Sequence, residues 1–184
     1  MTGSSLLPVA LHKKKLYFLF GKENELEKSA KGFSDFGGGV EPGEKIYQTA
    51  LREGAEELTG FLGDKDQLGK YIAAHGCFPL YAENIDYHTH IFKIDFDARF
   101  PEYYNQNHRF LWDRLENMLS KTKLFEKIEI EWFEISTLRR RLHEFRPFYQ
   151  DMVRMILENE TAIRHFCNSR RTQTKKKRSG GLFF

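Results

Sequence analysis

A glycine-rich segment that runs straight into a helix with crowded acids constrains this chain more than any other feature. Residues 37–44 read Gly-Gly-Gly-Val-Glu-Pro-Gly-Glu, a composition that predicts a shaped turn rather than one regular element. The segment from Lys45 to Leu58 is predicted to be a helix, because one face of it carries Ile46, Ala50, Leu51, Gly54 and Leu58. The missing side chain of Gly54 on that face would allow a close contact with a sheet, despite a helix cost of about 1 kcal/mol.

Three carboxylates share one turn of this predicted helix. Residues three and four apart are neighbours on a helix, so Glu53 faces both Glu56 and Glu57, and Arg52 faces Glu56. Each like-charge pair is unfavourable by roughly 0.2–0.5 kcal/mol. Two interpretations are open: a solvated acidic face, or a site for Mg²⁺, which prefers hard oxygen ligands. Glu44 precedes Arg52 by eight residues, where a loop could fold back and pair with it.

The spacing of these residues resembles a known family signature. The pattern G-x5-E-x7-R-E-x-x-E-E is matched by Gly38, Glu44, Arg52, Glu53, Glu56 and Glu57, and it resembles the signature of the Nudix hydrolases. The chain departs from the usual pattern at Gly54, where the family has a bulky apolar residue, and before Gly60, where Leu58 and Thr59 both intervene. The segment REGAEELTGFLG is similar to variants from large DNA viruses.

The resemblance implies a fold and an activity. The expected fold class is α/β (α+β): a Nudix-like α/β/α sandwich with a mixed sheet and the carboxylate helix on one face. The expected activity is hydrolysis of a phosphoanhydride bond in a nucleoside-diphosphate-linked substrate, with Mg²⁺ or Mn²⁺ as cofactor. Glu53, Glu56 and Glu57, with the backbone carbonyl of Gly38 or Gly39, would hold one or more ions.

The same resemblance assigns supporting and catalytic roles. Arg52 would hold the carboxylates in place, and Glu44 would brace Arg52. Family members take the base that removes a proton from the attacking water from the signature or from a later strand. Candidates here are Glu57, Glu129 and Glu131, and the sequence does not choose between them. Strand alternation places Glu129 and Glu131 on one face, opposite Ile128 and Ile130, where a solvated face is the alternative.

Apolar patterning predicts the remaining elements of a catalytic domain over residues 1–167. Strands are expected at 6–11, 16–20, 71–81, 87–96 and 128–135, a loop at 21–35 and a turn at 83–86. Residues 97–125 are expected to be a helical insertion, and residues 138–166 one or two helices. A base of the substrate could stack on one of Phe20, Phe33, Phe36 and Tyr87.

Residues 168–184 form a basic tail. Six cations and no acid lie in it (Arg170, Arg171, Lys175, Lys176, Lys177 and Arg178), so the rest of the chain is acidic although the formal charge is +3. We expect the tail to be disordered. It could bind the phosphates of RNA without reading sequence, act as a nuclear-localisation signal, or have no role.

Composition bears on the cellular compartment of the protein. Cys77 and Cys167 form neither a metal-binding pattern nor a disulfide framework, which suits reduced thiols in the cytoplasm. Neither a signal peptide nor a membrane-spanning segment is expected. The oligomeric state is open.

Three substrate classes fit the expected enzyme: the 5′ cap of RNA, a free nucleotide or dinucleotide removed in pool cleaning, and a diphosphoinositol phosphate. The basic tail suits an RNA substrate. The competing hypothesis is a non-catalytic Nudix-like binding module. The complete set of signature acids argues against that hypothesis, because such modules lose them.

Overall fold

The computed structural model describes residues 2–24, 31–119 and 126–169, and an N-terminal hairpin forms its centre. The hairpin consists of β1 (Gly3–His12) and β2 (Lys15–Glu23). Lys13 and Lys14 join them, and both have positive φ, as the tight turns of twisted hairpins require. The first eight residues of β1 are all buried, the pattern of a strand covered on both faces. The two strands predicted here are confirmed.

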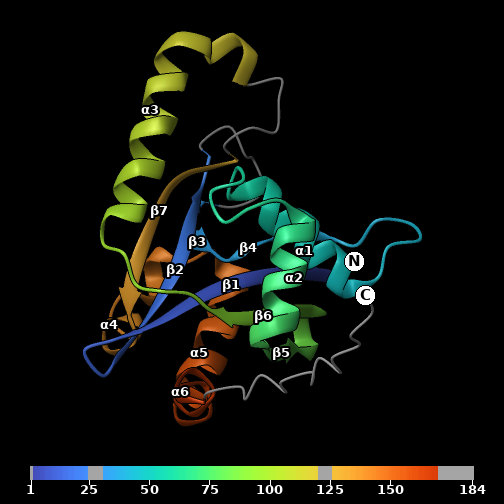
Figure 1. Cartoon of the computed structure of the whole chain (residues 1–184), viewed down its shortest axis with the longest axis vertical. Helices are drawn as coiled ribbons and strands as arrows, with labels where there is room; N and C mark the ends of the chain where they lie inside the picture. The colour runs from blue at the N-terminus through green and yellow to red at the C-terminus, as the bar shows by residue number, and fades with distance from the viewer. Residues whose placement is uncertain (1, 25–30, 120–125, 170–184) are drawn as a thin grey trace, which may run out of the picture.

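One mixed sheet surrounds this hairpin (Figure 1). Its other strands are β3 (Phe33–Ser34), β4 (Phe36–Gly39), β5 (Phe78–Ala82), β6 (Tyr87–Lys93) and β7 (Lys127–Glu134). Among the pairs of these strands in the described ranges, β1 and β6 are parallel and the others are antiparallel. Along one edge β1 pairs first with β4 and then with β2, so the glycine-rich segment enters the sheet beside the hairpin.

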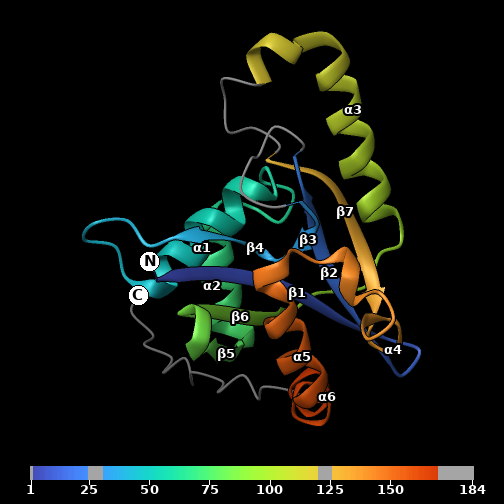
Figure 2. The same cartoon turned by 180° about the vertical axis from the view of Figure 1, so that it is seen from behind.

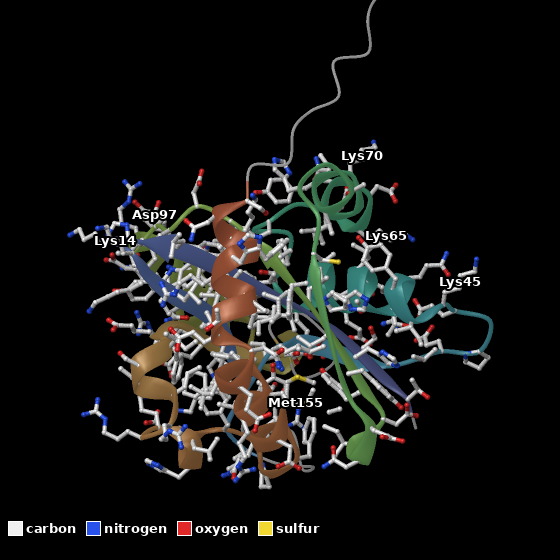
Figure 3. All side chains as sticks on the ribbon, turned by 90° about the horizontal axis from the view of Figure 1, so that it is seen from below. Lys14, Lys45, Lys65, Lys70, Asp97 and Met155 are labelled. Carbon is white, nitrogen blue, oxygen red and sulfur yellow. The ribbon has the colours of Figure 1, made fainter. Side chains whose placement is uncertain are left out.

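Helices cover both faces of the sheet, which confirms the predicted α/β/α sandwich (Figures 1 and 2). One face carries α1 (Ile46–Glu57), α2 (Lys65–His75) and α3 (Arg99–Leu119). The other carries α4 (Ile135–Leu138), α5 (Gln150–Glu158) and α6 (Glu160–Asn168). Figure 3 shows Met155 of α5 turned toward the sheet, while Lys45, Lys65 and Lys70 project outward on the side of α1 and α2.

Gly54 is the point where α1 lies closest to β1. A Cβ atom at Gly54 would lie 2.6 Å from Leu6 Cδ1, so any larger residue would push the helix away from the sheet. The predicted role of this glycine is confirmed. The carboxylate helix therefore lies directly on the central strand.

Two sequence predictions near the sheet are wrong in part. Within the predicted loop at 21–35, β2 continues to Glu23 and pairs with β3; residues 25–30 lie outside the described ranges. Residues 71–75 are the end of α2, and the strand begins only at Phe78. The missed signal is Asp64, whose carboxylate accepts hydrogen bonds from the backbone N–H groups of Asp66 and Gln67 and caps the helix.

The C-terminal half needs two further corrections. Residues 139–149 contain short 3-10 turns instead of a continuous helix, since Pro147 cannot continue one; α5 and α6 follow separately. In β7 burial recurs at Lys127, Ile130 and Phe133 instead of alternating, because Ile130 packs on the α1 face and Phe133 on the α5 face. The register with β2 also shifts between Lys127 and Glu129. The predicted helix in residues 97–125 is present as α3, and residues 120–125 lie outside the described part.

In the described part of the chain, no helix combines the length and the apolar character needed to cross a bilayer.

Candidate active site at the carboxylate helix

Pairing of β4 with β1 brings the glycine-rich segment against α1. Gly37 lies opposite Ser5, and Gly38 opposite Ser4. A Cβ atom at Gly38 would lie 2.3 Å from Glu53 Oε1, and one at Gly37 would lie 2.3 Å from Ser5 Cβ. Only glycine allows this approach, so backbone oxygens and amides of the segment lie next to the acids of the helix.

Arg52 lies at the centre of three carboxylates. Its Nε and Nη2 donate to Glu44 Oε1 and Oε2 at 2.9 and 3.0 Å, a bidentate pair. Its Nη1 donates to Glu53 Oε1 at 2.7 Å and to Glu56 Oε2 at 3.4 Å. The pairing of Glu44 with Arg52 that the spacing suggested is present. One guanidinium thus offsets the repulsion between the three acids.

Glu44 is tied down by further contacts. Thr49 Oγ1 donates to Glu44 Oε2 at 2.7 Å, and the backbone N–H of Glu41 donates to the same oxygen at 3.3 Å. The hydrogen bonds from Arg52 lower the pKa of Glu44 to about 2, against the opposing effect of burial. At neutral pH the carboxylate of Glu44 is therefore ionised, and its ion pair with Arg52 holds the glycine-rich segment against α1.

Glu57 has a different environment from Glu53 and Glu56. Its side chain is buried, Oε2 accepts from the backbone N–H of Gly37 at 2.8 Å, and Oε1 lies 3.2 Å from Lys127 Nζ. Glu56 is half-exposed at the rim, with 45% of its side chain accessible. The three acids that the sequence does not distinguish therefore differ: Glu53 and Glu57 are buried, and Glu56 lies at the rim.

Lys127 anchors a buried ionic network that sequence reasoning missed. Its ammonium is fully buried, pairs with Glu23 and Glu57, and donates to Ser34 Oγ at 3.0 Å. Glu23 in turn accepts from Arg146 Nη1 at 2.7 Å. Burial acts to lower the pKa of Lys127, but Glu57 and Glu23 outweigh it and the pKa is raised. In the sequence, the only signal for this network is a lysine at the start of a strand whose residues alternate between apolar and acidic.

Glu129 and Glu131 do not join these acids. The register places Glu129 opposite Lys22 and Glu131 opposite Phe20, and Phe20 belongs to the core on the α5 face. Glu131 binds Arg141, and Glu129 Oε2 lies 3.5 Å from Lys22 Nζ. The two acids share one face, as predicted, but it is the face turned away from α1.

The aromatic residues proposed for base stacking are core residues. Phe20, Phe33, Phe36 and Tyr87 are all buried. Phe20 and Phe33 pack edge-on against Phe133, and the Tyr87 hydroxyl donates to the buried carboxylate of Asp35 at 2.8 Å. The base-stacking interpretation of these four residues is therefore wrong, because none presents a free ring face to a ligand.

Comparison with known proteins agrees with this architecture. The family model described as NUDIX domain matches residues 9–156. Among solved structures, a C. elegans Ap4A hydrolase in a binary complex is 15% identical, covers 88% of this chain and 97% of its own, and has a TM-score of 0.50. The M. smegmatis Nudix hydrolase RenU is 11% identical, with coverages of 89% and 88% and a TM-score of 0.52. No curated protein sequence matches significantly.

The family match spans most of the chain and contains the whole acid signature. The chain therefore belongs to the Nudix family and is a Nudix-type hydrolase. The two solved structures share the fold with it. Nudix hydrolases in general use divalent ions such as Mg²⁺ or Mn²⁺.

The donor atoms at the site are of the chemical type that such an ion prefers. Glu53, Glu56 and the carbonyls of the glycine-rich segment are hard oxygens, which Mg²⁺ and Mn²⁺ prefer. No described group of three acidic, histidine or cysteine side chains is already gathered as a metal cage. Arg52 and Lys127 hold the acids in the arrangement seen. The predicted phosphate-binding residues Arg170, Arg171, Lys175, Lys176, Lys177 and Arg178 lie outside the described residues.

Proposed function

We propose that this Nudix-type enzyme hydrolyses a phosphoanhydride bond in a nucleoside-diphosphate-linked substrate. The observation that carries the proposal is the bidentate Arg52–Glu44 pair, which holds Glu53 and the glycine-rich segment together at the end of α1. The pair with Glu44 would be enough to hold Arg52, so the repulsion added by Glu53 and Glu56 brings a purely structural helix no further benefit. An enzyme that binds phosphates through a divalent ion gains an ordered set of hard oxygens.

Glu53, Glu56 and Glu57, with the backbone carbonyl of Gly38 or Gly39, are the residues that would hold the ion. When bound, such an ion offsets charge on the phosphate oxygens and makes a bound water more acidic. Arg52 keeps Glu53 and Glu56 oriented, and Glu44 keeps Arg52 in place. Burial raises the pKa of Glu57 well above its ordinary value, and the ammonium of Lys127 opposes this effect by offsetting the charge of the carboxylate.

The proton of the attacking water must pass to a carboxylate on the α1 face. Glu53 and Glu57 are on that face, whereas Glu129 and Glu131 are engaged on the opposite one. Glu57 already accepts from Gly37 and pairs with Lys127. Glu53, which pairs with Arg52, and Glu57 therefore both remain candidate bases on this face.

The substrate class remains a proposal in two forms. The 5′ cap of RNA is the first, because the six cations beyond Ser169 suit a polyanion. A free nucleotide or dinucleotide is the second, and the fold similarity to an Ap4A hydrolase favours it. A diphosphoinositol phosphate is a weaker alternative. A cytoplasmic enzyme, or a nuclear one if the tail is a targeting signal, suits these substrates.

A substrate panel tests the proposal. The pure protein is incubated with Mg²⁺ or Mn²⁺ and capped RNA, dinucleoside polyphosphates, nucleotide sugars or nucleoside triphosphates, and the products are identified by mass. Cleavage between two phosphates, lost when Glu53 is changed to Gln, is expected for at least one class. Absence of cleavage for every class, with both metals and a folded protein, would contradict the enzymatic proposal.

A further inference from the structure

A cavity near the proposed active site is lined largely by α3, the helix that the sequence predicts as an insertion. It has a volume of about 440 Å³ and lies between α3, the start of β7 and the end of β2. This volume lies within the range of small-molecule pockets. In Figure 1, α3 runs alongside β7 and continues beyond the end of the sheet. The helix α3 thus forms one wall of this pocket.

The cavity is adjacent to the carboxylate helix through Tyr104. The buried hydroxyl of Tyr104 donates to the backbone oxygens of Glu57 and Lys127 at 2.8 and 3.1 Å. Asn105 fixes α3 to β7, since its amide donates to Ile130 O at 3.1 Å and accepts from Ile130 N at 2.8 Å. The wall nearest the active site is therefore rigid.

The lining has aromatic rings at helical spacing. His108 follows Tyr104 by one turn and Trp112 by two, which corresponds to about 6 and 12 Å along the helix axis. The rings of His108 and Trp112 are stacked, with centroids 5.6 Å apart and planes inclined by 22°. His108 is buried and Trp112 half-buried. His108 and Trp112 thus give the cavity an aromatic wall.

Polar groups complete the lining. Arg109 supplies a cation, Asn24 lies at the β2 side, and Glu129 lies on the β7 side with 43% of its side chain exposed. A planar heterocycle with acceptors on its edge matches this combination of ring face, amide and guanidinium.

We propose that this cavity binds the nucleobase of the substrate, stacked on Trp112, with the phosphates directed out of the cavity toward α1. The proposal rests on the proposed function for the phosphate end and deepens it by assigning base recognition to α3.

Equilibrium binding tests the proposal without turnover. The full chain is titrated by calorimetry, in Mg²⁺, with the α,β-methylene diphosphates of adenosine and guanosine, whose bridging carbon prevents hydrolysis. Base-free methylenediphosphonate is the matched ligand. The variants are Trp112→Ala, Trp112→Phe and, as a control on the same helix, Phe110→Ala, whose side chain is 54% exposed and does not line the cavity.

Trp112→Ala should weaken binding of at least one nucleotide analogue about fivefold or more, the scale of lost base–aromatic stacking. Trp112→Phe should retain most of the affinity, and Phe110→Ala all of it. Binding of methylenediphosphonate should not change in any variant. Wild-type affinity of Trp112→Ala for both nucleotides, or an equal loss for the base-free ligand, would overturn the proposal.

A fluorescence measurement keeps the test decisive if Trp112→Ala fails to fold. The chain has two tryptophans, so Trp132→Phe leaves Trp112 as the sole reporter. The nucleotide analogues should quench it and methylenediphosphonate should not; equal spectra with all ligands would reject the pocket. If binding depends on Trp112 while the substrate panel shows no cleavage, the proposed function fails and the pocket stands.

Discussion

The buried ammonium of Lys127 lies 3.2 Å from Glu57 Oε1, so the last acid of the Nudix signature is paired with a lysine from β7. The same ammonium binds Glu23, and Glu23 binds Arg146. Two cations and two carboxylates thus balance one another beneath the glycine-rich segment. Because ions in a low-dielectric interior depend on their partners, removal of any one should affect both folding and the site.

The first prediction concerns Lys127. Lys127→Met removes the charge and keeps the approximate shape, leaving Glu57 and Glu23 short of a partner, so the free energy of unfolding should fall by about 3–5 kcal/mol. Urea denaturation measures it. The control is Lys22→Met, which breaks an exposed pair and should cost less than about 1 kcal/mol. The double variant Lys127→Met/Glu57→Gln should recover part of the loss; an unaltered midpoint in Lys127→Met would contradict the network.

The second prediction separates Glu57 from Glu56. If both bind the ion, Glu57→Gln and Glu56→Gln should each lower turnover by roughly 10²-fold or more. Only Glu57→Gln should also lower the melting temperature, because it leaves Lys127 with one fewer carboxylate, whereas Glu56 is half-exposed. From the sequence alone, neutralising Glu57 is expected to leave folding intact or improve it. Near-normal turnover in Glu57→Gln would remove it from the site.

The third prediction is a pH dependence from Glu44. Its pKa is lowered from 4.5 to about 2 in the fold, mainly by hydrogen bonds from Arg52. The ionised carboxylate therefore contributes stability above pH 4.5, and this contribution disappears as the pH falls toward 2. The difference in melting temperature between wild type and Glu44→Gln should be constant from pH 5 to 8 and shrink below 4.5. Glu41→Gln, on the same exposed segment, serves as control; a gap that persists unchanged to pH 2 would argue against the ionised pair.

The fourth prediction tests the basic tail. The structure places the cut after Ser169, because α6 continues to Asn168 and Lys93 Nζ donates to Ser169 O at 2.9 Å. Removal of residues 170–184 should weaken binding to long RNA and flatten its salt dependence by about 0.7 in slope for each lost phosphate contact. Turnover of a dinucleotide should hardly change. An identical salt slope after truncation would favour targeting or no role, and equal damage to both substrates would make the tail part of the fold.

The sequence by itself determined the features that depend on neighbours along the chain. The signature spacing from Gly38 to Glu57 identified the family, the helix and the Arg52–Glu44 contact, because residues eight or fewer apart meet through one loop and a few helical turns. Apolar runs predicted the central hairpin and α3. Where a local signal was overlooked, as with the Asp64 cap of α2, the prediction failed.

Only the tertiary structure determined which acidic side chains lie close together. Lys127 reaches Glu23 and Glu57 across 104 and 70 positions of sequence, and a register shift in β7 turns its side chain inward. The same pairing of β7 with β2 moves Glu129 and Glu131 to the face away from α1. Strand register and sheet order fix these contacts, and neither is encoded in the local pattern, since shifting a strand by one residue exchanges its two faces.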